Sequence, residues 1–128
     1  MPNAMKRKGS AFERSQRDYA RANGFPHCET TRAGYQRDAG DNHLDPVNGL
    51  GVGVIQQCKN TRAPQWNTWV AELEAQKREA KADFAFLTWK RRGVADPGEQ
   101  FALMPVREVL KLLRCAGYGQ EWPHDERP

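Results

Sequence analysis

Residues 45–59 have the sequence DPVNGLGVGVIQQCK, in which two short stretches that can form strands are separated by glycines. The pattern predicts one strand over residues 45–50 and a second over residues 52–59. The two strands are expected to meet near Gly49 and Gly51, because glycine accepts the backbone angles that a tight hairpin turn requires. This predicted β-hairpin is the centre from which the rest of the fold is inferred.

Three side chains suited to a hydrolytic site gather at one edge of the predicted hairpin. If the two strands pair as neighbours, Asp45 and Gln57 come side by side. Side chains alternate between the faces of a strand, so Gln57 and Lys59 share one face while Cys58 points to the other, as a core residue would. Oxygen ligands hold Mg²⁺ or Mn²⁺, and a nearby lysine can stabilise the charge that develops during phosphodiester hydrolysis.

Periodic patterns on both sides of the hairpin predict an α/β domain with the element order α-β-β-β-α-β-β-α. Glycine and proline set the boundaries: Gly24 and Gly117 end helices, and Pro105 begins the last helix. A polar loop is expected over residues 32–42. The other expected elements are a helix over 11–23, a strand over 25–31, a helix over 66–81, strands over 84–90 and 100–104, and a helix over 105–116.

The boundaries of the domain follow from composition and from one helix-start signal. We expect a flexible basic leader over residues 1–7, a single domain over 8–117 and a tail over 118–128. Ser10 can cap the first helix, with Glu13 three residues later in the capping-box position. Taken by itself, the capping box is the simplest role for Glu13.

Length, cysteine content and charge exclude several classes of protein. The chain has 128 residues, of which 38% are hydrophobic, so it fits one domain and contains no run long enough to cross a bilayer. Its three cysteines, an odd number without a CxxC pair, argue against a disulfide scaffold or a zinc site and suit a reducing cytoplasm. Residues 1–37 carry eight Lys and Arg against three Asp and Glu, which predicts a polyanionic partner.

Several motifs together make the chain similar to a known family. The segment RKGSAFER, residues 7–14, begins a helix that ends at Gly24-Phe25. Together with Asp45-Pro46 and Gln57-Cys58-Lys59, it resembles the PD-(D/E)XK signature of the restriction-endonuclease-like superfamily, and within it the archaeal-type Holliday-junction resolvases. The likeness is strongest to small resolvase-like nucleases of actinobacterial phages and extends over residues 6–115. The motifs shared with them are KGSAFER at 8–14, CKN at 58–60 and KRRG at 90–93.

The resemblance implies a restriction-endonuclease-like fold, with a mixed central sheet flanked by helices, and a Mg²⁺-dependent endonuclease that resolves four-way DNA junctions. Paired symmetric nicks imply a homodimer, since a twofold axis supplies two sites. A phage-encoded protein of this kind acts in the cytoplasm of its bacterial host. The implied metal ligands are Glu13, Asp45, Gln57 and the backbone carbonyl of Cys58, with Lys59 as a further catalytic residue. The candidate phosphate contacts are Lys8, Arg14, Arg32, Arg37, Lys90, Arg91 and Arg92.

One departure from the family pattern keeps alternatives open. Gln57 stands where the family has a glutamate, and an amide oxygen can ligate a metal but brings no charge. The chain could therefore be a weakened junction-binding protein, another PD-(D/E)XK nuclease acting on flaps, single strands or restriction sites, or an interaction domain with an accidental constellation. Asp41 and His43 are residue types found in HNH-type sites, but no second histidine-asparagine motif follows them. For Trp66 and Trp69, three residues apart on a predicted helix, core packing is the simplest role.

Overall fold

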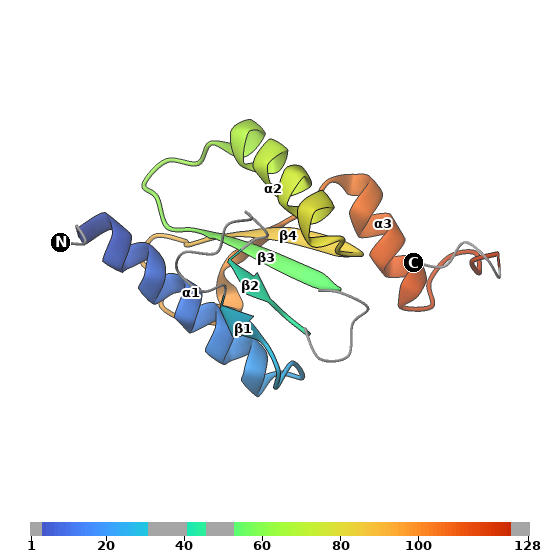
Figure 1. Ribbon diagram of the computed structural model, residues 1–128, viewed down its shortest axis with the longest axis horizontal. Coiled ribbons are helices and arrows are strands. Elements are labelled where there is room, and N and C mark those ends of the chain that lie inside the picture. Colours follow the sequence, from blue (N-terminus) through green and yellow to red (C-terminus); the bar gives the residue numbers. More distant parts are fainter. Residues whose placement is uncertain (1–3, 31–40, 46–52, 124–128) are drawn as a thin grey trace.

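The computed structural model describes residues 4–30, 41–45 and 53–123, and helices and strands follow one another there in the predicted order (Figure 1). The predicted α/β class and element order are confirmed, with a short 3-10 helix added before the last strand. The helices are α1 (Ala4–Ala22), α2 (Trp66–Ala80), η1 (Pro97–Glu99, the 3-10 helix) and α3 (Val106–Cys115). The strands are β1 (Glu29–Thr30), β2 (Asn42–His43), β3 (Val54–Lys59), β4 (Phe84–Trp89) and β5 (Phe101–Leu103).

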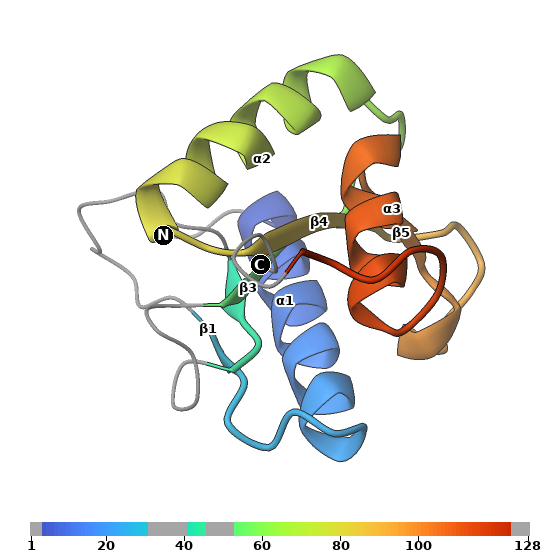
Figure 2. The same ribbon diagram turned by 90° about the vertical axis from the view of Figure 1, so that its right-hand side faces the viewer.

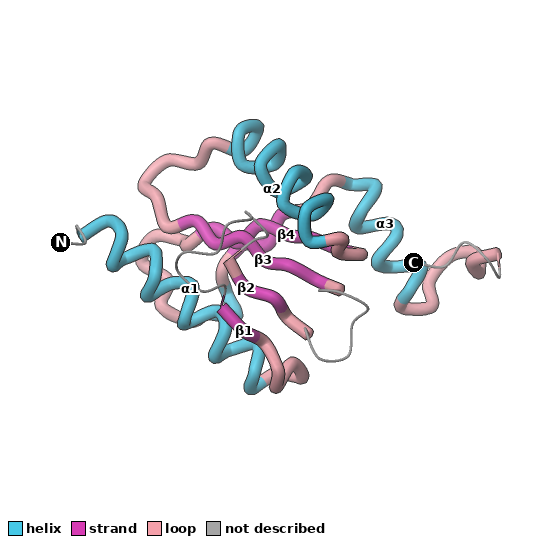
Figure 3. The backbone as a smooth tube through the Cα atoms, in the orientation of Figure 1, coloured by secondary structure: helices cyan, strands magenta, loops and turns pink. Residues whose placement is uncertain are grey.

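The strands form one mixed sheet in the order β1-β2-β3-β4-β5 (Figure 3). Strands β3 and β4 run parallel and α2 connects them, because parallel neighbours require a crossover connection. The other neighbouring pairs are antiparallel. Helices α1 and α2 cover opposite faces of the sheet (Figures 1 and 2). The parallel pairing brings the carboxyl ends of β3 and β4 to the same edge, where the candidate site lies.

An apolar core fills the space between α2 and the sheet. Leu73 of α2, Ile55 of β3 and Leu87 of β4 are almost completely buried and belong to one cluster. Trp69, one helical turn before Leu73, is buried beside them, and Trp66 packs edge-to-face on it with ring centroids 5.5 Å apart. The expectation that the two tryptophans serve the core is confirmed.

Helix α1 begins earlier than the sequence pattern indicates. Gly9 and Ser10 lie inside the helix, so the predicted cap at Ser10 and the capping-box role of Glu13 are wrong. Residues 4–7, expected in the leader, are helical too, since the helix formers around Gly9 outweigh its cost of about 1 kcal/mol. The end of the helix is predicted correctly, because Gly24 adopts a left-handed φ of +102°.

The strand that pairs with β3 is β2, a few residues before the predicted strand. Asn42 lies opposite Gln56 and His43 opposite Ile55 in an antiparallel register. Asp45 is not part of a strand, and the predicted turn falls on residues 46–52, which lie outside the described residues. The sequence pattern places the strand too late, because Asn42 is polar and strand interiors are ordinarily apolar. In the fold Asn42 is fully buried, and hydrogen bonds hold its side chain.

No helix in the described part of the chain has the length and apolar character needed to cross a bilayer.

Candidate active site

Two carboxyl groups meet where α1 crosses the carboxyl end of β3. Glu13 comes from α1, and Asp41 immediately precedes β2; a side-chain hydrogen bond joins them. Asp41 Oδ2 also accepts the Cys58 backbone N–H at 2.7 Å, and the Asp41 backbone N–H donates to the Gln56 carbonyl at 3.1 Å. One bond from the backbone and one to the carboxylate of Asp41 thus hold this residue against β3.

The proximity of the two acids changes the acidity of Glu13. Burial, the negative charge of Asp41 and the hydrogen bond to it raise the pKa of Glu13 from 4.5 to about 7. The positive charges of Arg14 and Lys59 act in the opposite direction and do not cancel the effect. The pair therefore holds a proton up to neutral pH, which a bound cation could replace.

Gln57, on β3, carries a buried amide oxygen that no described residue satisfies. Its side chain is only 7% exposed, and its Oε1 has no hydrogen-bond partner among the described residues. Gln57 stands between Gln56 and Cys58, the two residues whose backbone groups bind Asp41. A buried amide oxygen without a donor is costly unless a ligand satisfies it.

Lys59 ends β3 with its ammonium group near the acids. Lys59 Nζ lies 3.3 Å from Glu72 Oε2 of α2 and 5.8 Å from the centroid of the Trp69 ring. Its charge reaches Glu13, whose pKa it lowers. Glu72, which the sequence analysis did not single out, thus orients the cation whose charge lowers the pKa of Glu13.

Cys58 lies on the other side of β3 from Gln57 and Lys59, as predicted. It is 8% exposed, and Asn42 Nδ2 donates to its Sγ at 3.7 Å. Burial raises the pKa of the Cys58 thiol well above its ordinary value, so this cysteine stays neutral. Its backbone carbonyl as a metal ligand stays a prediction.

The structure does not bring Asp45 to this cluster, and the predicted juxtaposition of Asp45 with Gln57 is wrong. The Leu44 N–H donates to the Val54 carbonyl at 3.0 Å, so the chain after β2 runs toward the start of β3. That direction separates Asp45 from Gln57 by about four strand residues, roughly 13 Å. Asp41 takes the place expected for Asp45, because pairing begins earlier in the chain than the apolar pattern indicates.

A network of buried amides fixes the backbone beneath the carboxyl pair. Asn42 Nδ2 donates to the Glu13 carbonyl at 3.1 Å and to Gln56 Oε1 at 3.0 Å. Gln56 Nε2 in turn donates to Gln16 Oε1 at 3.0 Å and to Thr88 Oγ1 at 2.8 Å. The network ties α1, β2, β3 and β4 together. Its signal in the sequence was the presence of polar residues at strand positions otherwise occupied by apolar ones.

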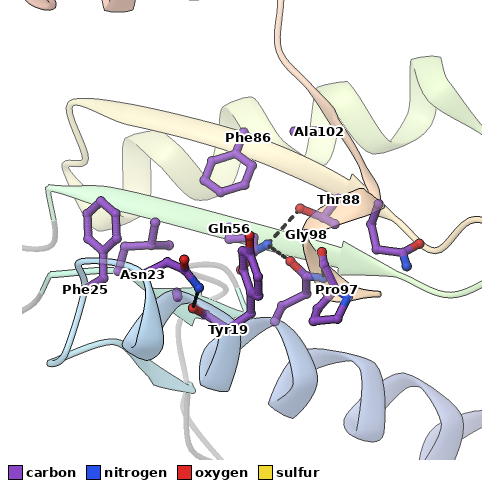
Figure 4. Close-up of a pocket in the computed structure, with 13 residues that line it drawn as sticks. Tyr19, Asn23, Phe25, Gln56, Phe86, Thr88, Pro97, Gly98 and Ala102 are labelled. Atoms are coloured by element: carbon purple, nitrogen blue, oxygen red, sulfur yellow. Dashed lines mark hydrogen bonds between the residues drawn. The ribbon is translucent and has the colours of Figure 1, made fainter. Parts of the chain in front are cut away.

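A cavity of about 240 Å³ opens on the α1 face of the sheet, over part of this network (Figure 4). Tyr19 and Phe25 line it from α1 and the segment after it, and Phe86 lines it from β4. Gln56 and Thr88 lie at its wall, where a dashed line in Figure 4 marks their hydrogen bond. The cavity is mainly apolar, and it contains none of the acidic groups of the site.

A second cavity, of about 230 Å³, is strongly basic and opens where β3 and β4 end. Lys90 Nζ is used internally, because it donates to the carbonyls of Arg91 and Val94. The Arg91 guanidinium stacks 4.5 Å from the Phe101 ring centroid, while Arg92 is exposed. The cavity is lined by Lys8, Asn60, Thr61, Arg62, Trp89, Lys90, Arg91, Arg92 and Gly93.

Four of the seven residues predicted to contact phosphates line the basic cavity, and one further cationic residue lines it with them. Lys8, Lys90, Arg91 and Arg92 line it, together with Arg62, which the sequence analysis did not single out. Arg14 is exposed on α1 beside Glu13 in the chain. Arg32 and Arg37 fall on residues 31–40, outside the described residues. Asn60, which also lines the cavity, directly follows Lys59 at the end of β3.

The oxygen donors of the site fit a hard divalent cation. Mg²⁺ keeps several waters and takes one or two carboxylates, which Glu13 and Asp41 can supply. Gln57 has an unsatisfied amide oxygen, and its role as a further ligand stays a prediction. Within the described ranges, no cluster of three or more His, Cys, Asp or Glu side chains forms a metal site.

Comparisons with protein-family models, curated proteins and solved structures find no match to this chain.

Proposed function

We propose that this chain is a Mg²⁺-dependent DNA endonuclease of restriction-endonuclease-like fold that acts as a homodimer on four-way junctions. The observation that carries the proposal is the meeting of Glu13 and Asp41 near the cation of Lys59, at the sheet edge where the basic cavity opens. Acidic oxygens for a metal beside cations for phosphates are the two requirements of phosphodiester hydrolysis by this chemistry. The order of the elements and the mixed sheet support the proposed fold.

Each residue of the site has a separate role in the proposed hydrolysis. Glu13, Asp41 and Gln57 Oε1 would hold the ion, which would polarise the phosphoryl oxygen and lower the pKa of the attacking water. Glu13 would have to give up the proton that it holds at neutral pH, because a ligating carboxylate must be ionised. Lys59, oriented by Glu72, stabilises the negative charge that develops on the phosphoryl group.

The basic cavity positions the substrate without selecting a sequence. Arg62 and Arg92 are exposed, and both line the cavity at the ends of β3 and β4. Contacts between such cations and phosphates fix the register of a duplex but do not identify bases. Selectivity for branched DNA then comes from the geometry of two arms held at two symmetric sites.

The decisive experiment compares cleavage of a synthetic four-way junction and of a linear duplex with the same sequence, each with Mg²⁺. We expect paired nicks in the junction and little cleavage of the duplex. Asp41→Asn should abolish cleavage while leaving junction binding intact, and Asp45→Asn is the matched control that should cut like the wild type. Preferential cleavage of flaps or single strands would instead assign the chain to another class of PD-(D/E)XK nuclease.

A junction-binding protein without catalysis is the second candidate, and Gln57 is the observation that favours it. A neutral amide in place of a carboxylate weakens the attraction for Mg²⁺. A wild-type chain that binds the junction but does not cut it, combined with cleavage by Gln57→Glu, would establish this second candidate. Absence of both binding and cleavage would leave only the interaction-domain alternative.

A further inference from the structure

Helix α3 turns its apolar side chains outward and a charged side chain inward. Val106, Val109, Leu110 and Leu113 follow helical spacing and form one stripe, which ordinarily faces a core. Here Val106 is 73% exposed and Leu110 56% exposed, whereas Glu108 on the opposite side is 6% exposed. We call the stripe and the adjoining Tyr118, which is also exposed, the α3 apolar face.

Ion pairs hold α3 in this orientation. Glu108 Oε1 lies 2.6 Å from Lys77 Nζ of α2, and its Oε2 lies 2.9 Å from Lys111 Nζ. Lys111 Nζ also donates to the Asp83 carbonyl at 2.9 Å, just before β4. Rotating the helix to bury its stripe would break the Lys77–Glu108 ion pair and the bond from Lys111 to the Asp83 carbonyl, and would leave Glu108 with only Lys111 of its own helix. The apolar face is therefore directed away from the domain by the domain itself.

The chain's own described tail does not cover the apolar face. Residues 118–123 turn back at Gly117 and are tied to Arg114, whose guanidinium lies 3.8 Å from the Trp122 ring centroid. Arg114 Nε also donates to the Gln120 carbonyl at 3.1 Å. With these contacts made, Leu110 and Tyr118 remain exposed. Something outside the described residues is needed to remove this surface from water.

We propose that the α3 apolar face is the twofold interface between two copies of this chain, with α3 packed against α3 of the second copy. An isologous interface must complement itself, and an apolar stripe does so without needing an opposite charge. The cations next to the stripe are already engaged within the chain: Arg107 with Glu74, Lys111 with Glu108, and Arg114 with Trp122. Arg107 and Lys111 are thus neutralised by carboxylates, Arg114 is held on the Trp122 ring, and the stripe itself brings no charged side chain to the centre of the interface.

A hollow and a projection on the same surface add to this complementarity. A cavity of about 370 Å³ beside the stripe is lined by residues that include Leu110, Arg114 and Trp122. Trp122 Nε1 is a buried donor with no acceptor in the described part of the chain. Tyr118, 69% exposed and four residues before Trp122 in the chain, carries a hydroxyl that can accept such a bond, so we expect each copy to offer the group that the other lacks.

The proposed interface rests on the proposed function in one respect: paired nicks require two sites. The experiment that tests the interface uses neither DNA nor metal. The full chain is examined by sedimentation velocity over a wide concentration range, in the absence of both. We expect a dimer, and Leu110→Glu should weaken it by about thirtyfold or more, as expected for a central interface residue. Ala75→Glu, which adds the same charge to an exposed position of α2, is the matched control and should leave the dimer unchanged.

The outcomes separate this interface from the proposed activity. Circular dichroism checks that each variant is folded, and Val106→Gln replaces Leu110→Glu if that variant does not fold. A wild-type chain that stays monomeric at all concentrations overturns the proposal, as does a folded variant that dimerises like the wild type. Junction cleavage is measured separately, so a dimer without nuclease activity would support the interface while refuting the proposed function.

Discussion

The carboxyl pair should make the domain less stable as the pH rises toward neutrality. The pKa of Glu13 is raised from 4.5 to about 7 in the folded protein by burial and by Asp41. Between these values the folded state keeps a proton that the unfolded state has released, so the free energy of unfolding falls as pH rises. The loss is absent below the unfolded value of 4.5 and complete above about 7.

The size of this effect follows from the shift in pKa. A difference of about 2.5 in pKa corresponds to roughly 3 kcal/mol, which screening by water at a partly exposed group reduces to about 2 kcal/mol. Asp41→Asn removes the neighbouring charge and offers an amide donor instead. The variant should therefore recover about 1 kcal/mol of the loss, the remainder being due to burial.

Two measurements test this reasoning. Carbon NMR of labelled glutamate should give a titration midpoint near neutrality for Glu13, and a lower midpoint in Asp41→Asn. Urea unfolding at about pH 4 and about pH 8 should give a smaller pH-dependent loss for that variant than for the wild type. Asp45→Asn is the control and should titrate like the wild type. A Glu13 midpoint that stays unchanged in Asp41→Asn, or that moves in Asp45→Asn, would refute the assignment of the pair.

Three further predictions concern the metal, the substrate and the helix α3. Gln57→Glu should lower the Mg²⁺ concentration for half-maximal junction cleavage, because a charged oxygen binds a hard cation more strongly; an unchanged or higher concentration would remove Gln57 from the metal site. Junction affinity should fall steeply with salt, and Arg92→Ala should reduce the slope of log K against log salt by about 1, so equal slopes for both proteins would argue against a phosphate contact. Burial raises the pKa of Glu108, but hydrogen bonds and charges from Lys77 and Lys111 outweigh it, so its pKa is lowered and it stabilises the fold above its unfolded value of 4.5. Glu108→Gln should consequently lose about 1–3 kcal/mol at neutral pH, with the difference disappearing in acid as the wild-type group is protonated, and an equal difference at both pH values in denaturation curves would contradict this.

Much of the architecture could be predicted from local patterns. The α/β class, the element order and the alternation that separates Cys58 from Gln57 follow from periodicities of the backbone itself, which act within a few residues. The end of α1 at Gly24 was equally local, because few other residues accept its positive φ. Boundaries fixed by distant contacts could not be obtained in this way. The position of β2 is one such boundary, because the buried Asn42 is held by Gln56 of β3 and by the Glu13 carbonyl of α1.

The composition of the site and the outward face of α3 were decided only by the tertiary structure. Two aspartates, Asp41 and Asp45, precede β3 within a few residues of each other, and nothing local distinguishes them. The register of β2 against β3 selects Asp41 for the site. The buried hydrogen bonds of Asn42 set that register. The stripe of α3 is equally clear in the sequence, but its direction depends on the ion pair of Glu108 with Lys77 of α2. Spacing along a chain determines which residues share a face, because that is a property of the backbone. What the face meets depends on contacts between segments far apart in sequence, and those exist only once the chain has folded.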